Sequence, residues 1–288
     1  MPKNSQLKNE HISIEVAPLG AEMQFLRTNA GDDLLWHGDP EFWTGRAPVL
    51  FPIVGRAPDD TIAVGDHSAP MPQHGFARRS VFDVIEQTDV MCRHVLTDNA
   101  VSRATYPFAF ALEITHRLDG PTLHVTARVM NKGTQTMPFG FGFHPAFSWP
   151  LPKAGQDPHH VTLASNAAPE MRAIEDGLLL CDPIPSPFVD GDLKLREALF
   201  ANDAMVFPNG SAPLRYGPHN GPSLEFAFKN LPDLALWRPV GAPFLCIEPW
   251  HGTAPYVGTG PQIADRPNTI SLAAGDAVEF GYAVKVMI

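Results

Sequence analysis

Two histidines and one glutamate stand out, because each lies in a short segment punctuated by glycine or proline and the three segments are far apart in the chain. They are His74 in PQHGFAR (72–78), His144 in FGFHPAF (141–147) and Glu248 in CIEPW (246–250). An imidazole titrates near neutral pH and a carboxylate can accept a proton, so these side chains suit general acid–base catalysis. The pattern indicates chemistry in which one group removes a proton and another donates one.

The backbone is restricted at two of the three residues. His144 and Glu248 each precede a proline, and proline pushes the residue before it out of the α region into extended geometry. We therefore expect both side chains to lie on locally stiffened, extended backbone. His74 instead precedes Gly75, which permits a left-handed turn or a close approach of two backbones.

Two arginines end the neighbouring segments. Arg56 closes the apolar run FWTGRAPVLFPIVGR (42–56), and Arg78 closes PQHGFAR. A guanidinium at either position could fan over the hydroxyl oxygens of a ligand or pair with an acidic side chain. The spacing alone leaves both possibilities open for each arginine.

A structural role is also open for each member of the trio. His74 could be a hydrogen-bonded loop histidine, and His144 could belong to an aromatic cluster with its flanking phenylalanines. Glu248 could be paired, because an unpaired carboxylate is costly to bury in an apolar run. The same apolar surroundings would raise its pKa toward that of a general base.

The elements that must position these residues have the pattern of short strands. The chain of 288 residues contains 30 prolines and 23 glycines, which interrupt long helices. Alternation of apolar and polar residues is clearest over 110–130, where two strands meet at Asp119-Gly120. We expect one all-β domain over residues 1–288, built as a large antiparallel β-sandwich. Further strands are predicted at 12–16, 81–86, 223–228 and 278–286, and the best helical window is 193–200.

Composition narrows the function classes. The formal net charge of −10 disfavours nucleic acid and anionic membranes as partners. No segment has the roughly 18 apolar residues of a membrane span. Cys92, Cys181 and Cys246 form no CxxC pair, and the N-terminal residues lack an apolar signal region, so we expect a reduced, cytoplasmic protein. The oligomeric state is not predicted.

Four segments, taken in order along the chain, resemble the aldose 1-epimerase (mutarotase) family, especially its bacterial members of broad specificity. They are GRAPVLFPIVGR, QHGFAR, HPAF and IEPW. The resemblance begins at ISIEVAPLGAEM (12–23) and extends to the last predicted strand. It implies a galactose mutarotase-like supersandwich with a sugar on its concave face. It also implies that His144 is the catalytic acid and Glu248 the catalytic base. No metal or organic cofactor is expected, since the reaction has no redox or hydrolytic step.

The resemblance further implies residues that bind the substrate, a small aldose whose α- and β-anomers are interconverted. Arg56 and His74 match two of them, and Asp203 in FANDAMVF is the best match for an expected aspartate. QHGFAR also resembles the hexose-6-phosphate 1-epimerase branch, in which an arginine matched by Arg78 helps to hold the phosphate. FWTGRAPVLFP fits that branch less well, so a phosphorylated sugar is the alternative substrate.

Two other classes of function stay open. Two histidines and a carboxylate are the ligand set of non-haem iron oxygenases, and His37-Gly38-Asp39 is a formal His-x-Asp match. A non-catalytic sugar-binding sandwich is the second possibility, because tryptophans can stack on sugar rings, although most large aromatic residues fill cores. The tryptophans are Trp36, Trp43, Trp149, Trp237 and Trp250.

Overall fold

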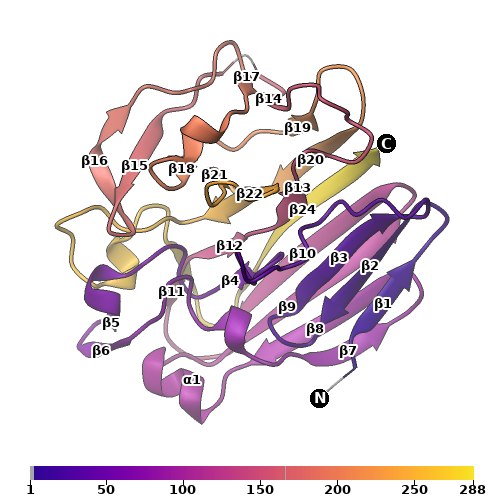
Figure 1. Cartoon of the computed structure of the whole chain (residues 1–288). Helices are drawn as coiled ribbons and strands as arrows, with labels where there is room; N and C mark the ends of the chain where they lie inside the picture. Colours follow the sequence, from indigo (N-terminus) through magenta and orange to yellow (C-terminus); the bar gives the residue numbers. More distant parts are fainter. Residues whose placement is uncertain (1–2, 166) are drawn as a thin grey trace.

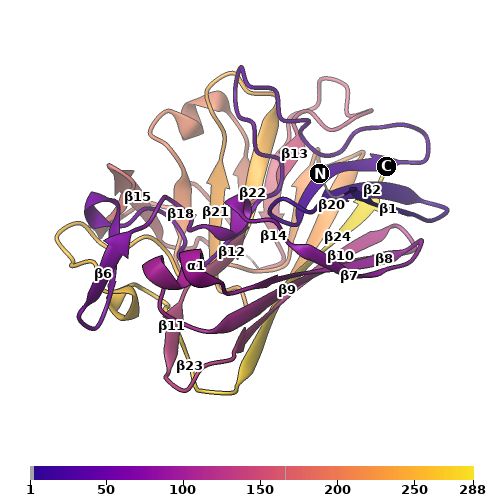
Figure 2. The same cartoon turned by 90° about the horizontal axis from the view of Figure 1, so that it is seen from below.

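A computed structural model describes residues 3–165 and 167–288, so residues 1, 2 and 166 of the expected domain lie outside the described residues. Two large antiparallel sheets dominate the architecture (Figure 1) and are seen from below in Figure 2. The all-β prediction is therefore confirmed. The nine-stranded sheet has the order β17 (Asp192–Lys194), β14 (His160–Leu163), β19 (Leu214–Gly217), β20 (Ser223–Lys229), β24 (Ala277–Met287), β10 (Thr122–Asn131), β9 (Phe110–Asp119), β8 (Met91–Thr97) and β7 (Asp83–Gln87).

The eight-stranded sheet carries the site described below. Its order is β16 (Leu178–Ile184), β15 (Met171–Glu175), β18 (Met205–Phe207), β21 (Asp233–Trp237), β22 (Phe244–His251), β12 (Phe141–Phe143) and β4 (Val49–Leu50), with β13 (Ala146–Ser148) also paired to β22. A three-stranded sheet consists of β1 (Ser5–Lys8), β2 (Ile12–Ala17) and β3 (Glu22–Thr28). Two further pairs are β5 (Thr61–Val64) with β6 (His67–Pro70), and β11 (Met137–Phe139) with β23 (Ile270–Leu272).

Helices are short. The single α-helix in the described part of the chain is α1 (Ala100–Thr105), which the sequence analysis did not predict; the Asn99 side chain caps it by accepting the N–H groups of Val101 and Ser102. None of the helices in the described residues is long and apolar enough to cross a bilayer. The 3₁₀ turns are η1 (Pro58–Asp60), η2 (Ala77–Arg79), η3 (Glu197–Phe200) and η4 (Ile263–Asp265), of which η3 occupies part of the helical window 193–200.

The predicted hairpin over 110–130 is confirmed as β9 and β10, with Asp119 paired to Thr122 across the turn. The predicted strands at 12–16, 223–228 and 278–286 lie within β2, β20 and β24. The segment predicted at 81–86 begins as a strand only at Asp83, because Val81 makes an isolated bridge to Leu19 instead.

The core lies between the two large sheets. Phe280 of β24 stacks on Phe141 of β12, with ring centroids 4.9 Å apart. Leu245 and Ile247 of β22 are fully buried in the same cluster as Val284 of β24. Because side chains alternate along a strand, the residues between them on β22 must face away from this core.

Candidate active site

A break in the pairing of β22 creates the centre of the site. β12 pairs with β22 at Trp250, and β13 pairs with it at Cys246. The link between β12 and β13 runs through His144 and Pro145, so it passes the part of β22 that contains Glu248. The two segments recognised from their prolines therefore lie side by side.

The local sequence accounts for this geometry. Pro249 has no N–H group to donate, and it lies where β22 passes from one partner strand to the other. Alternation along β22 places Glu248 on the face opposite Leu245 and Ile247, away from the core between the sheets. The strand is buried on both faces, so a carboxylate on its outer face enters a protected site rather than open solvent.

A cavity of about 350 Å³ covers this face of the sheet. Such a volume lies near the lower end of the range typical of small-molecule sites. Its walls come from β15, β16, β18, β21 and β22 and from the loops before β5 and η2. The lining residues are Trp43, Gly55, Gln73, His74, Arg78, His144, Ile174, Gly177, Leu179, Asp203, Ala204, Val206, Trp237, Glu248, Trp250 and Ala254.

His144 and Glu248 meet at the cavity wall. Nε2 of His144 lies 3.2 Å from Oε2 of Glu248, and only 7% and 2% of the two side chains are exposed. Oε2 of Glu248 nevertheless has no aligned hydrogen-bond partner, and neither does Nδ1 of His144. Both groups are buried, in contact and able to form further hydrogen bonds.

Another buried carboxylate shows what a structural role looks like in this fold. Asp233 accepts the backbone N–H groups of Asn209 and Gly252 at 2.9 Å each. It also accepts the side-chain amide of Asn268 at 2.7 Å. Asp233 is thus satisfied within the protein, whereas Glu248 keeps an oxygen available to a ligand.

Burial shifts the two proton affinities in opposite directions. It raises the pKa of Glu248 well above its usual value, an effect that the charge of Arg78 opposes and the charge of Asp203 reinforces. Burial lowers the pKa of His144 well below its usual value, and the positive charge of Arg78 adds to this effect. The pair therefore holds a single proton over a wide range of pH.

Aromatic rings fix the orientation of His144. Trp43 stacks on its imidazole at a centroid distance of 4.7 Å, and Trp237 meets it edge-on at 5.7 Å. The neighbouring Phe143 turns instead into the core, where it contacts Tyr282 at 4.9 Å. The aromatic contacts of His144 therefore come from residues distant in sequence.

His74 is held in a defined tautomer. The backbone N–H of Gly55 donates to Nδ1 of His74 at 3.0 Å, and the backbone N–H of His74 donates to the Gly55 carbonyl at 2.9 Å. Burial, together with the charge of Arg78, lowers the pKa of His74 to about 3, so the ring is neutral. Its proton therefore resides on Nε2, which makes His74 a hydrogen-bond donor.

Gly75 is required by this loop. His74 and Gly75 both have positive φ angles, 66° and 75°. A Cβ atom on Gly75 would overlap the carbonyl oxygen of Phe51. Only glycine fits the close approach between the segment at 51–55 and the segment that presents His74.

Gly75→Ala is expected to lower the free energy of unfolding by about 3 kcal/mol or more, because backbone strain and overlap combine. Gly120→Ala is the matched control, since Gly120 has a φ angle of 52° and no atom near its Cβ position. It should cost only about 1–2 kcal/mol. Urea denaturation of both variants measures the difference, and equal losses would contradict the packing argument.

The predicted binding residues do not all reach the cavity. Arg78 and Asp203 line it together with His74. Arg56 does not: its Nε and Nη2 atoms donate to the two carboxylate oxygens of Asp60 at 2.7 and 2.8 Å on the exposed surface. The guanidinium of Arg56 therefore lies outside the cavity. The other five predicted site residues line it, namely His74, Arg78, His144, Asp203 and Glu248.

Comparison with known proteins identifies the family. The model of the aldose 1-epimerase family matches residues 3–177, which is more than half of the chain. This chain belongs to the aldose 1-epimerase family. The resemblance inferred from the four motifs is confirmed.

Individual relatives of this aldose 1-epimerase family member agree with the assignment. Protein LacX of Lactococcus lactis is 29% identical over 98% of this chain and 99% of its own length. A galactose mutarotase related enzyme from Lactobacillus acidophilus has a TM-score of 0.93 at 26% identity, covering 99% of this chain and 98% of that one. A galactose mutarotase-like protein from Lactobacillus casei has a TM-score of 0.91 at 28% identity, covering 99% and 100% of the two chains. The mutarotase-like sandwich is thus the fold of this family member.

Metal-binding geometry in this family member differs from the iron site considered from sequence. Donor atoms of His144, Cys246 and Glu248 lie within 4.8 Å of one another, whereas His74 is not part of that group. His74, His144 and Glu248 therefore do not form the two-histidine, one-carboxylate set; in the described residues, donor atoms of that kind lie close together at His160, Asp192 and His219, which do not line the cavity. His37 and Asp39 lie 3.9 Å apart on the exposed surface and do not line the cavity.

Sequence reasoning missed part of the site. Gln73 lies in QHGFAR but was not singled out. The apolar residues of β15, β16 and β18 belong to no motif, because alternation alone does not reveal which sheet face is hollowed. Three tryptophans considered for sugar stacking do line the cavity, namely Trp43, Trp237 and Trp250.

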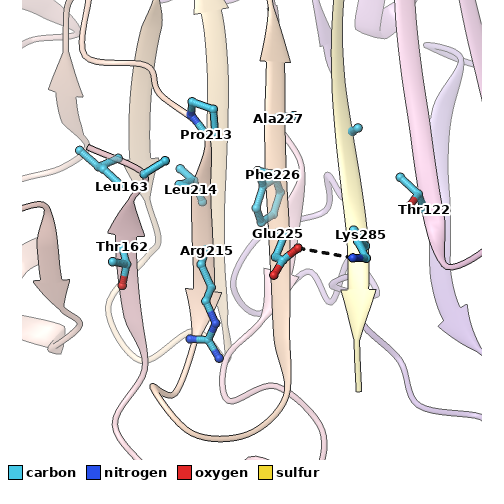
Figure 3. Close-up of a pocket in the computed structure, with 12 residues that line it drawn as sticks. Thr122, Thr162, Leu163, Pro213, Leu214, Arg215, Glu225, Phe226, Ala227 and Lys285 are labelled. Carbon is cyan, nitrogen blue, oxygen red and sulfur yellow. Dashed lines mark ion pairs between the residues drawn. The ribbon is translucent and has the colours of Figure 1, made fainter. Parts of the chain in front are cut away.

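A second, more open cavity of about 520 Å³ lies on the nine-stranded sheet (Figure 3). It contains an ion pair between Glu225 of β20 and Lys285 of β24 with a separation of 3.9 Å. Arg215 and Thr162 line it as well, but none of the predicted site residues does. Of the two cavities, only the smaller one is lined by predicted site residues.

Proposed function

We propose that this aldose 1-epimerase family member interconverts the α- and β-anomers of a free aldose by opening and closing the sugar ring. The observation that supports this most strongly is the separation of 3.2 Å between Nε2 of His144 and Oε2 of Glu248 at the wall of the cavity. The ring oxygen and the anomeric hydroxyl are bonded to the same carbon atom. Two groups in such close contact can each face one of these oxygens.

Ring opening begins from the ion-paired form of the two residues. The Glu248 carboxylate removes the proton from the C1 hydroxyl, and the electrons of that O–H bond form the carbonyl. The C1–O5 bond breaks, and the His144 imidazolium protonates O5. The products are the open-chain aldehyde, protonated Glu248 and neutral His144.

Ring closure reverses the roles. Rotation about C1–C2 presents the other face of the aldehyde. His144 removes the proton from the O5 hydroxyl as O5 attacks C1, and Glu248 protonates the carbonyl oxygen as its π bond breaks. The enzyme returns to its starting protonation state. No redox or hydrolytic step is involved.

The buried environment favours the open-chain intermediate. Burial raises the pKa of Glu248 and lowers that of His144, so both effects favour the neutral pair over the ion pair. The neutral pair, protonated Glu248 with neutral His144, is the state of the two residues when the sugar is the open-chain aldehyde. The charge of Arg78 acts in the opposite direction on Glu248 and keeps the carboxylate accessible.

Other cavity residues hold the ring. His74 donates a hydrogen bond through Nε2, and Asp203 accepts hydrogen bonds from sugar hydroxyls. Nε1 of Trp250 is buried without a hydrogen-bond partner and can donate to a sugar oxygen. The faces of Trp43 and Trp237 supply an apolar surface beside His144.

The charge distribution favours a free aldose over a 6-phosphate. Arg78, which the resemblance links to phosphate binding, acts on the charge of Glu248 and so serves the reacting end of the cavity. Asp203 adds a negative charge to the wall. Exchange NMR with glucose, galactose and their 6-phosphates tests the choice: faster exchange of a phosphorylated sugar would overturn it.

Arg78→Met is expected to lower kcat/KM by about 10–100-fold, the range for losing a charged hydrogen-bonding group. Arg56→Met is the matched control and should change it by less than about twofold, because the surface ion pair with Asp60 contributes little. Anomer exchange at low substrate concentration measures both variants. A larger loss of kcat/KM in Arg56→Met than in Arg78→Met would indicate that Arg56 acts at the site and would contradict the role proposed for Arg78.

The pH profile of kcat/KM is expected to be flat around neutrality. At low pH the pair gains a second proton, but the lowered pKa of His144 places that loss well below 6.5. At high pH the pair loses its last proton, and the raised pKa of Glu248 places that loss well above 4.5. Initial rates across the pH range measure the profile, and a single rise centred near 6.5 would show that an ordinary exposed imidazole controls the rate.

A further inference from the structure

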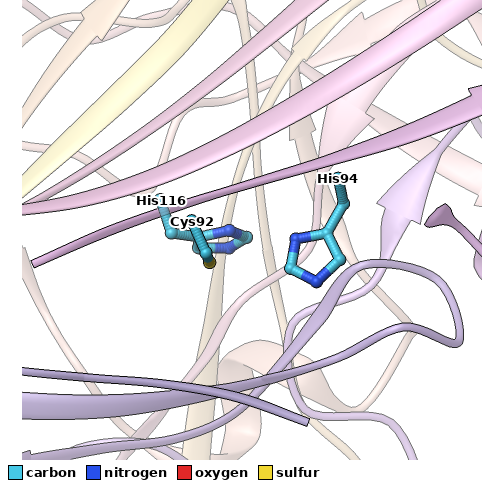
Figure 4. Close-up of side chains that lie close together, drawn as sticks. All are labelled: Cys92, His94 and His116. Atoms are coloured by element: carbon cyan, nitrogen blue, oxygen red, sulfur yellow. The ribbon is translucent and has the colours of Figure 1, made fainter. Parts of the chain in front are cut away.

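Cys92, His94 and His116 form a cluster of metal-ligand side chains that the proposed reaction does not use. Cys92 and His94 are two residues apart on β8, and His116 is paired with Cys92 from β9. All three therefore project from one face of the nine-stranded sheet. Figure 4 shows them reaching into the space between this sheet and the N-terminal strands. Their donor atoms lie within 4.8 Å of one another.

Three ring nitrogens of this cluster are buried without partners. The exposed fraction is 0% for Cys92 and His94 and 3% for His116. Neither ring nitrogen of His94 has a hydrogen-bond partner, and Nδ1 of His116 has none. Buried polar groups are normally paired, because an unpaired one loses its hydration without compensation.

A structural histidine elsewhere in the fold provides the comparison. Nε2 of His159 accepts the backbone N–H of Leu151 at 2.9 Å, and its Nδ1 contacts the carbonyl of Asp157 at 3.2 Å. Both nitrogens of that buried ring are satisfied by the protein. His94 differs because its imidazole makes no such bond although it is entirely enclosed.

We propose that Cys92, His94 and His116 bind a divalent d-block cation of the zinc class in a structural site between the N-terminal sheet and the nine-stranded sheet. Thiolate sulfur and imidazole nitrogen are the ligands that zinc prefers, at about 2.3 and 2.0–2.1 Å. Small side-chain rotations bring donors spaced within 4.8 Å onto one ion.

The strand β1 closes the site. Ser5 of β1 is completely buried, and its hydroxyl contacts the Cys92 thiol but makes no other hydrogen bond. This hydroxyl is available for the fourth position of a tetrahedral ion. Because β1 also contacts β8 and β9, the cation links the three-stranded sheet to the larger one.

The ionisation states suit this chemistry. Burial lowers the pKa of His94 to about 4 and that of His116 to about 3, so both rings are neutral and able to coordinate. Burial raises the pKa of Cys92 to about 12, so the cation must displace the thiol proton. One proton is therefore released when the thiolate binds.

The experiment is to refold the full chain with one equivalent of Co²⁺, which enters zinc sites and reports on their ligands. Refolding is needed because the cluster is enclosed in the native protein. The wild type should bind about one Co²⁺ per chain and show a thiolate-to-cobalt charge-transfer band with the visible bands of tetrahedral Co²⁺. Absence of that band in refolded wild type would overturn the proposal without any variant.

Three cysteine variants locate the ion. Cys92→Ala should lose the charge-transfer band, whereas Cys181→Ala and Cys246→Ala should keep it. Cys246 is the decisive control, since it is equally buried and lies beside His144 and Glu248. Loss of the band in Cys246→Ala but not in Cys92→Ala would assign the ion to the other cluster and refute this one.

Thermal unfolding provides a second readout. Refolding with Zn²⁺ at a hundredfold excess over its Kd should raise the Tm of the wild type by about 5 °C. His94→Leu, which replaces an unpaired ring by an apolar side chain, should fold and show no zinc-dependent rise. An equal rise in His94→Leu would contradict the proposed site.

Discussion

Glu248→Gln is expected to lower kcat for anomer exchange by about 10²–10⁴-fold, the usual contribution of a general acid or base. Glutamine keeps the shape of the side chain but cannot accept the C1 hydroxyl proton. Oε2 of Glu248 lies 3.2 Å from His144 and has no aligned hydrogen-bond partner. At this position, glutamate and glutamine therefore differ in proton transfer and not in packing. KM should change by only a few-fold.

The stability of this variant separates catalysis from folding. Because the folded pKa of Glu248 is raised above its unfolded value, ionisation of this carboxyl destabilises the native state as pH rises through that interval. Glu248→Gln should therefore have a Tm at neutral pH at least as high as that of the wild type. Glu225→Gln, at an exposed ion pair, is the control for the charge change and should keep full activity. A Glu248→Gln protein with near wild-type kcat would remove Glu248 from the mechanism.

His144→Gln is expected to lower kcat by a similar factor, about 10²–10⁴-fold, because O5 loses its proton donor. Since the two residues transfer protons in the same steps, the double variant Glu248→Gln/His144→Gln should be little worse than either single one. His74→Ala should differ in kind, raising KM more than His144→Gln does, because His74 holds the ring through its Nε2 proton.

Steady-state kinetics over a range of sugar concentrations separates these outcomes. Independent effects that multiply in the double variant would contradict a shared proton-transfer unit. A pure kcat effect in His74→Ala would assign that residue a role in proton transfer and contradict its role in binding.

Proline placement explains why the segments that carry His144 and Glu248 could be singled out from sequence. Pro145 and Pro249 constrain the residues before them, and in the structure they lie where β22 changes partner strands. The same local rule identifies the segments but does not place them side by side. Their contact depends on strand pairing between residues about a hundred positions apart, which the sequence pattern does not specify.

Arg56 shows where local reasoning failed to place a side chain. Asp60 stands four residues after it, and the turn η1 brings their side chains together as a surface pair. The sequence analysis left such an ion pair open but could not choose it, because the turn depends on Asp59 having a φ angle of 50°. Arg78, which was also predicted to bind the substrate, lines the cavity.

His116 is a residue that the pattern could have revealed. It continues the alternation of Leu112, Ile114 and Leu118 on the buried face of β9, where an apolar residue is expected. His94 lies on the same buried face of β8 as Cys92, which is the strand partner of His116. A histidine at a position where the alternation predicts a buried apolar residue can be recognised from sequence alone. Its contact with Cys92 cannot, because that contact depends on the register between β8 and β9.

Polarimetry of freshly dissolved α-galactose and α-glucose tests the central claim most directly. Wild-type protein should bring the optical rotation to its equilibrium value faster than buffer alone, in proportion to enzyme concentration, and Glu248→Gln/His144→Gln should approach the buffer rate. If the wild type leaves the rate at that of buffer for every aldose tested, or if the double variant retains wild-type acceleration, then His144 and Glu248 do not open the ring.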